Sequence, residues 1–157
     1  MTAPETVSDP DLKEVAWDLS HLLNGAGDDP QAGVDALLAD AQRRADAFAE
    51  RYAGKLAELD GAGLIEAMHE LADIEEIAGR AGTYAHLAFA IDTASPANGA
   101  LLQRVEEKGT QIETALLFFH LEWAELDDAR AEELLATEGL EFARHHLQTA
   151  RRYRRTC

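Results

Sequence analysis

The residues best suited to chemistry are His69, Glu70 and Asp73, which belong to the short sequence HELAD. In a zinc-peptidase helix, two histidines four residues apart bind the metal from one face, and the glutamate after the first histidine deprotonates the bound water. Asp73 stands where the second histidine is needed. A carboxylate can bind zinc, but no third ligand stands out downstream, and neither His86 nor His120 has a motif around it. We therefore expect His69 to be an ordinary residue of a polar helix face.

Two further metal motifs are also incomplete. Glu66 and His69 fit the Glu-x-x-His pattern of di-iron bundles, but such bundles need a second copy and two more inward glutamates. His120 and Glu122 match part of the zinc-deaminase pattern, which also requires a Pro-Cys-x-x-Cys segment. The chain has one cysteine, Cys157, so the zinc-deaminase interpretation fails. A single cysteine also cannot form an internal disulfide, which favours a reducing cytoplasm. The sequence therefore predicts no catalytic residue, no metal ligand and no cofactor-binding residue.

Paired acidic residues and aromatic residues have ordinary structural interpretations. Three acidic pairs are adjacent in the sequence, namely Glu75-Glu76, Glu106-Glu107 and Asp127-Asp128. Neighbours on a helix point about 100 degrees apart, so we expect solvated faces rather than acid–base pairs. The larger aromatic residues are expected to be core residues or contacts of a further domain: Trp17, Phe118, Phe119 and Trp123. Tyr84 could line a channel, although a half-buried packing role is expected.

The charge of the chain is strongly acidic and unevenly distributed. Its 157 residues include 30 Asp and Glu against 14 Lys and Arg, for a net charge of −16. Residues 144–157 hold five of the arginines and no acid, which leaves −21 on the remainder. An acidic body repels nucleic-acid phosphates and anionic lipid, so neither is an expected partner. The arginine-rich end is a candidate phosphate patch, although arginines near a helix C-terminus also complement its dipole and pair with acidic neighbours.

The first residues of the sequence do not match a secretory signal. Residues 1–11 are polar, contain Pro4 and Pro10, and lack both the cationic start and the apolar stretch of a secretory signal. No run of about 18 apolar residues is present, so no membrane span is predicted. We therefore expect a cytoplasmic protein.

The fold class predicted from the sequence is all-α. Alanine and leucine dominate, and no segment alternates apolar and polar residues as a half-buried strand would. We expect an antiparallel bundle of long helices, with residues 1–27 as an extended N-terminal segment and residues 28–157 as one domain of about five helices. Within the N-terminal segment, residues 17–23 are expected to dock as an extended or short helical clamp ahead of a glycine-rich turn.

Helix starts follow from capping residues. The first helix is expected to open at Asp28 or Asp29, with Pro30 in its first turn. The second follows a turn at residues 59–63 and is capped by Asp60. The third, capped by Ser95, should run from Pro96 to about Trp123 and be the longest. Two shorter helices are expected at about 129–136 and 140–155.

Apolar residues recur at three- and four-residue steps in each long helix, which predicts a core-facing stripe. In the first helix the stripe comprises Val34, Leu37, Leu38, Ala41, Ala45, Phe48 and Tyr52. In the second it comprises Leu64, Met68, Leu71, Ile74 and Ala78, and in the third Leu101, Val105, Ile112, Leu116, Phe119 and Trp123. Gly79 and Gly82 each lower helix stability by about 1 kcal/mol relative to alanine, which indicates either a close approach of another helix or a kink, and we expect the close approach.

Five segments in order carry a family resemblance. They are Trp17-Asp18-Leu19-Ser20, Tyr52-Ala53-Gly54-Lys55-Leu56, Gly79-Arg80-Ala81-Gly82-Thr83-Tyr84-Ala85, Asp92-Thr93 and Leu116-Leu117-Phe118-Phe119-His120-Leu121-Glu122-Trp123. In this order and spacing, residues 15 to about 154 resemble the N-terminal helical region of the oligoendopeptidase F family, relatives of thimet oligopeptidase.

The resemblance implies a role without catalysis. Members of that family are cytoplasmic zinc endopeptidases that cut short peptides in a channel between helical halves. Their His-Glu-x-x-His helix lies far beyond the region matched here, so no catalytic residue is carried over. The resemblance implies that these helices form part of the channel wall and that zinc belongs to the full-length relatives. The expected partner is the missing catalytic domain or a peptide substrate.

The end of the chain favours truncation. Family members continue from an arginine-rich helix into the catalytic domain, whereas this sequence departs at Arg155-Thr156-Cys157. We therefore expect a fragment without the zinc domain and without peptidase activity of its own. The alternative is a free-standing helical interaction module or complementing subunit, whose apolar stripes bind another helix or a second copy.

Overall fold

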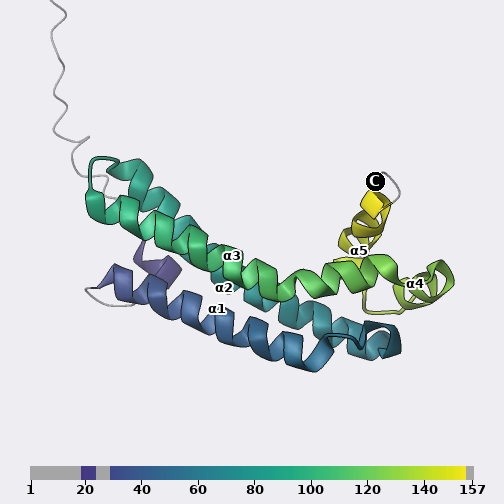
Figure 1. The fold of residues 1–157 in the computed structure, drawn as a ribbon. Coiled ribbons are helices and arrows are strands. Elements are labelled where there is room, and N and C mark those ends of the chain that lie inside the picture. Colours follow the sequence, from purple (N-terminus) through teal and green to yellow (C-terminus); the bar gives the residue numbers. More distant parts are fainter. Residues whose placement is uncertain (1–18, 24–28, 155–157) are drawn as a thin grey trace, which may run out of the picture.

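The helices of this chain are seen in a computed structural model, which describes residues 19–23 and 29–154. The elements in order are the short 3-10 helix η2 (Ser20–Leu23), α1 (Pro30–Tyr52), η3 (Leu56–Glu58), α2 (Gly61–Ile91), α3 (Pro96–Glu125), α4 (Asp128–Leu135) and α5 (Glu141–Arg154). The described ranges contain no strand, and the all-α prediction with five α-helices is confirmed. Figure 1 shows α1, α2 and α3 side by side, with α4 and α5 at one end.

Each long helix begins at a side chain that caps its first N–H groups, as predicted. Asp29 caps α1 by accepting a hydrogen bond from the N–H of Ala32 at 3.1 Å. Asp60 caps α2 in the same way, from the N–H of Gly63 at 2.7 Å. Ser95 caps α3, and a proline follows both Asp29 and Ser95 in the first turn. Local sequence therefore fixes where these helices start.

One expectation about helix length is wrong. The helix that starts at Pro96 has 30 residues, whereas α2 has 31. The reason is that α2 continues without a break through Gly79 and Gly82 as far as Ile91. Two glycines lower the stability of a helix, but packing against neighbouring helices offsets that cost.

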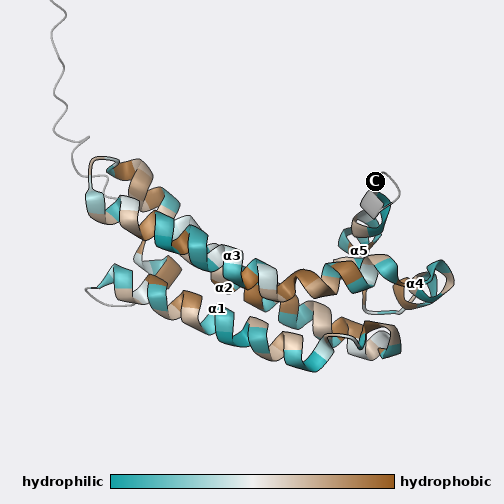
Figure 2. Ribbon diagram, viewed as in Figure 1, coloured by the Kyte–Doolittle hydropathy of each residue, from teal (hydrophilic) through white to brown (hydrophobic). Residues whose placement is uncertain are grey.

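The predicted apolar stripes form the core. All seven stripe residues of α1 and all six of α3 are buried. In α2 the stripe is buried except for Ala78, which is half-buried. Each long helix carries both apolar and polar residues around its circumference, as expected for amphipathic helices that share one core (Figure 2). Leu117 and Leu121, beside the α3 stripe, are exposed at 49% and 55%.

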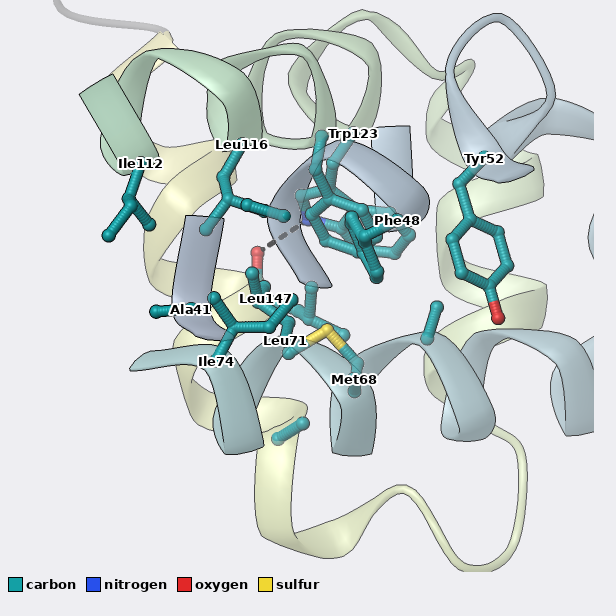
Figure 3. Packing of buried hydrophobic residues seen from close by; sticks show 14 of the residues in the cluster. Ala41, Phe48, Tyr52, Met68, Leu71, Ile74, Ile112, Leu116, Trp123 and Leu147 are labelled. Atoms are coloured by element: carbon teal, nitrogen blue, oxygen red, sulfur yellow. Dashed lines mark hydrogen bonds between the residues drawn. The ribbon is translucent and has the colours of Figure 1, made fainter. Parts of the chain in front are cut away.

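The short C-terminal helix is fixed to the bundle through a tryptophan. Trp123 is 1% exposed, and its indole Nε1–H donates a hydrogen bond to the backbone oxygen of Leu147 at 2.9 Å (Figure 3). A buried indole N–H needs such a partner because burying it unpaired would be costly. Phe48 of α1 packs on Phe119 with ring centroids 5.7 Å apart. The aromatic core therefore lies at the end of the bundle where α5 is attached.

Only part of the predicted N-terminal clamp is described. Trp17 and residues 24–27 lie outside the described residues. The described part forms η2, where Leu23 is buried, and the Arg80 Nε–H of α2 donates to the backbone oxygen of Leu22 at 3.0 Å. These residues dock on the bundle as a short helix. Among the described residues, no helix combines the length and apolar character needed to cross a bilayer.

Candidate functional site

His69, the first residue of the incomplete zinc motif, is part of a contact between helices. Its exposed imidazole stacks on the ring of Phe142 in α5, with centroids 4.2 Å apart and planes 14° from parallel. Phe142 is itself 51% exposed. The imidazole therefore covers an apolar ring at the junction of α2 and α5.

Glu70 and Asp73 point toward α1 instead. The Glu70 carboxylate pairs with the Arg51 guanidinium and accepts a hydrogen bond from the Tyr52 hydroxyl at 3.1 Å. Burial of Tyr52 raises the pKa of its hydroxyl, the neighbouring Arg51 partly opposes this shift, and the hydrogen bond to Glu70 adds to it. Asp73 lines a hollow of about 400 Å³ that Arg43, Arg44 and Arg51 also line. These carboxylates lie among arginines of α1 that can balance their charge.

The residues present do not fit a zinc ion at this motif. His69 is stacked on α5, whereas Glu70 is held by α1, so the two side chains diverge. Within residues 19–23 and 29–154, no three His, Cys, Asp or Glu side chains come together as metal ligands. The di-iron pattern does not fit either, because its ligands project into the core of a bundle, whereas Glu66 and His69 are both exposed.

Glu122, from the incomplete zinc-deaminase motif, stabilises a turn. Its Oε1 accepts a hydrogen bond from the backbone N–H of Gly54 at 2.6 Å, and its Oε2 accepts one from the N–H of Leu56 at 3.4 Å. Gly54 has a φ of +76°, a conformation that glycine adopts at little cost. The carboxylate of α3 thus fixes the turn that ends α1 and starts η3.

His120 lies where α2, α3 and α5 meet. It is half-buried, and its ring lies 5.9 Å, centroid to centroid, from the ring of His146 in α5. Burial and the nearby His146 lower the pKa of His120 below its ordinary 6.5, and Glu75 of α2 partly opposes this shift. A neutral imidazole is therefore favoured at this junction.

Two arginines of the arginine-rich end, Arg144 and Arg151, bind backbone carbonyls. Arg151 donates to the oxygens of Trp123 at 2.7 Å and Leu126 at 2.8 Å, and pairs with Asp128 at 2.5 Å. Its side chain is only 13% exposed. Arg144 binds carbonyls at the end of α4 in the same way: it donates hydrogen bonds to the Leu135 oxygen at 2.9 Å and to the Thr137 oxygen. Both arginines therefore bind the last carbonyls of other helices rather than those of α5, and each pairs with an acidic residue, Asp128 for Arg151 and Glu141 for Arg144.

The remaining aromatic and acidic residues agree with their structural interpretations where they are described. Phe119 is buried like Trp123, Phe118 packs half-buried against the core, and Tyr84 is half-buried, which raises the pKa of its hydroxyl. The three acidic pairs are exposed.

A groove between α2 and α3 is the surface feature that the sequence analysis missed. It has a volume of about 680 Å³. The residues lining it from α2 are Glu75, Ala78, Gly79, Gly82 and His86, and those from α3 include Val105, Glu106, Gly109, Thr110, Glu113, Leu117 and His120. Its inner wall is apolar and includes Leu38, Ile112 and Leu116, whereas its charged rim is acidic.

Glycines open this groove, so the expected close helix approach at Gly79 and Gly82 is wrong. Apart from the adjoining backbone of its own helix, a Cβ atom added at Gly79, Gly82 or Gly109 would meet no atom of the described residues within 4 Å. No other helix in the described part of the chain therefore packs against these positions, and the missing side chains leave space instead. The His86 ring folds back along α2, with Nδ1 2.8 Å from the oxygen of Gly82. Three glycines on facing stripes of two adjoining helices were the sequence signal for this space.

Comparisons of the chain with protein-family models, with curated proteins and with solved structures find no match.

Proposed function

We propose that these helices are a non-catalytic portion of an oligoendopeptidase F-like zinc metalloendopeptidase, equivalent to the N-terminal helical region of that family. In this role they form a wall of the channel in which short peptides are cut. Zinc and the residues that activate water belong to a separate catalytic region.

The observation that carries this proposal is that segments of the resemblance contact one another. Glu122, in the segment 116–123, accepts hydrogen bonds from Gly54 and Leu56, which belong to the segment 52–56. Arg80, in the segment 79–85, binds the oxygen of Leu22, close after the segment 17–20. The segments 52–56 and 116–123 therefore meet in space, although 68 residues separate Gly54 from Glu122 in the chain. Their pairing supports one inherited helical scaffold.

The state of the candidate catalytic side chains supports the same proposal. His69 is stacked on Phe142, and Glu70 is occupied by Arg51 and Tyr52, so both serve contacts between helices. The long helices have the proportions of a wall, because 30 residues of α-helix span about 45 Å. A rigid wall of that length restricts access to short, flexible substrates.

Complementation in trans tests the proposal. The catalytic region of an oligoendopeptidase F-like enzyme, lacking its own N-terminal helices, is mixed with this chain and assayed with a quenched fluorescent peptide. The expected result is saturable complex formation by light scattering, together with a rise in zinc-dependent cleavage. A catalytic region that neither binds the chain nor gains activity would contradict the proposal. An unrelated acidic three-helix bundle of similar size is the control.

A further inference from the structure

We infer that the groove between α2 and α3 is a docking site for a basic amphipathic helix. The inference stands on the groove itself and does not require the peptidase proposal. The occupant has leucine-like residues on one face, which enter the groove, and lysine or arginine residues on both flanks, which meet its rim.

The chain already places a helix on this side of α2 and α3, at one end. α5 reaches α2 where Phe142 stacks on His69, and it reaches α3 where Leu147 binds Trp123. His120 contacts His146 of α5 and also lines the groove. The groove between α2 and α3 therefore begins beside their contact with α5, and α5 lies at that end of the long helices (Figure 1).

The dimensions of the groove suit a short helix. From Glu75 to His86 the α2 wall spans about 17 Å, at 1.5 Å per residue, which corresponds to about three helical turns. The missing side chains at Gly79, Gly82 and Gly109 let an incoming backbone approach closely. Leu117, which is 49% exposed, supplies an apolar side chain for the occupant to cover. Helices bind such grooves through side chains spaced by three and four residues.

The negative charge on the rim of the groove favours a basic helix as its occupant. Among the residues that the structure describes, the charged ones that line the groove are the acids Glu75, Glu106 and Glu113, and no lysine or arginine lines it. The hollow between α1 and α3, of about 710 Å³, is different: the acids Asp35, Asp46 and Glu50 are matched there by Arg43, Arg104 and Lys108. Cations flanking a docked apolar stripe would be attracted to the acidic rim and would hasten association.

The test uses a labelled synthetic peptide of about 14 residues, with leucines at helical spacing and lysines on the flanks, and follows binding by fluorescence anisotropy at neutral pH. The first comparison peptide has the same composition in an order without helical periodicity, and the second carries glutamate in place of lysine. We expect the amphipathic basic peptide to bind at least about tenfold more tightly than either comparison peptide.

Two sets of variants locate the binding. Gly79→Leu with Gly82→Leu fills the groove, and Ala36→Leu with Ala100→Leu adds the same bulk at exposed helix positions elsewhere. For charge, the three rim glutamates are changed to lysine, and the matched control changes three exposed glutamates that do not line the groove: Glu58, Glu132 and Glu138. Circular dichroism verifies that each variant is folded.

The expected result is an affinity loss of about tenfold or more for both groove variants, with little change in both controls. Equal losses in the two charge variants would mean that the overall negative charge attracts the peptide, and would overturn the inference. Binding that survives the filled groove, or absence of binding by the unaltered chain, would overturn it as well. If the triple lysine variant fails to fold, the leucine pair alone decides the outcome.

Discussion

The carboxylate of Glu122 in α3 accepts a hydrogen bond from the backbone N–H of Gly54 at 2.6 Å. This bond joins the end of α1 to α3, two elements separated in the chain by the whole of α2. Gly54 occupies the left-handed region at φ +76°, so the turn depends both on a glycine and on the acceptor that fixes its N–H.

Replacing Glu122 with alanine is expected to lower the free energy of unfolding by about 1–2 kcal/mol, because a charge-assisted hydrogen bond to the turn is lost. Urea unfolding followed by circular dichroism measures the change. Glu125→Ala, at an exposed position on the same helix, is the control and should change stability by less than about 0.5 kcal/mol. Equal effects at the two positions would show that the hydrogen bond to Gly54 contributes nothing specific.

Alanine at Gly79 or Gly82 is expected to raise the free energy of unfolding by about 0.5–1 kcal/mol each, because alanine is the better helix former and its Cβ meets no atom within 4 Å. Thermal unfolding checks the gain. Gly61→Ala is the contrasting variant, since its Cβ would collide with the Thr137 side chain, and a loss of stability is expected. A loss at Gly79 and Gly82 would restore the close-approach explanation that the structure rejects.

The pH dependence of stability should report on His120. Its folded-state pKa is lowered by burial and by His146, so the unfolded chain takes up a proton at a higher pH than the folded chain. Stability is therefore expected to fall as the pH decreases through the unfolded-state pKa of about 6.5 toward the lower folded-state value.

His120→Gln removes this contribution, so the wild type should lose more stability than the variant between about pH 7.5 and 5.5. The facing groups, His146 of α5 and Glu75 of α2, remain in both proteins, and only titrations that are not coupled to His120 cancel in the difference. Denaturant unfolding across that range supplies the measurement, with His145→Gln, exposed on α5, as the control. Parallel pH profiles for wild type and His120→Gln would refute the assignment.

Arg151→Ala is expected to cost about 2–3 kcal/mol of unfolding free energy, because two carbonyls at the end of α3 lose a largely buried guanidinium. Arg151→Lys should be intermediate, since an ammonium lacks the fork that reaches both oxygens. The neighbouring Arg152 is exposed, and its replacement by alanine should be nearly neutral in the same urea titration. If Arg151 and Arg152 behaved alike, the arginines would act through charge alone.

Much of the fold could be predicted because its signals are local. Asp29, Asp60 and Ser95 cap helices through bonds to residues three positions away, and apolar spacing identified the buried stripes of α1 and α3. The site depended on contacts between distant residues. Nothing near His69 in the sequence indicated that Phe142 would stack on it.

The glycines in α2 illustrate the same limit. Their cost to the helix was visible in the sequence, but whether a neighbour or open space faces them depends on tertiary packing. Gly79 and Gly82 turned out to face open space beside Gly109 of α3. Sequence patterns reveal that such positions are unusual, and the packed structure decides their use.

The most direct test of the central proposal, that these helices are a non-catalytic portion of a zinc peptidase, is a peptide-cleavage assay with added zinc. Purified protein, a quenched fluorescent peptide and stoichiometric zinc are incubated with and without a chelator, beside the His69→Ala variant. No chelator-sensitive cleavage is expected from either protein. Zinc-dependent turnover by the unaltered chain that disappears in His69→Ala would contradict the proposal.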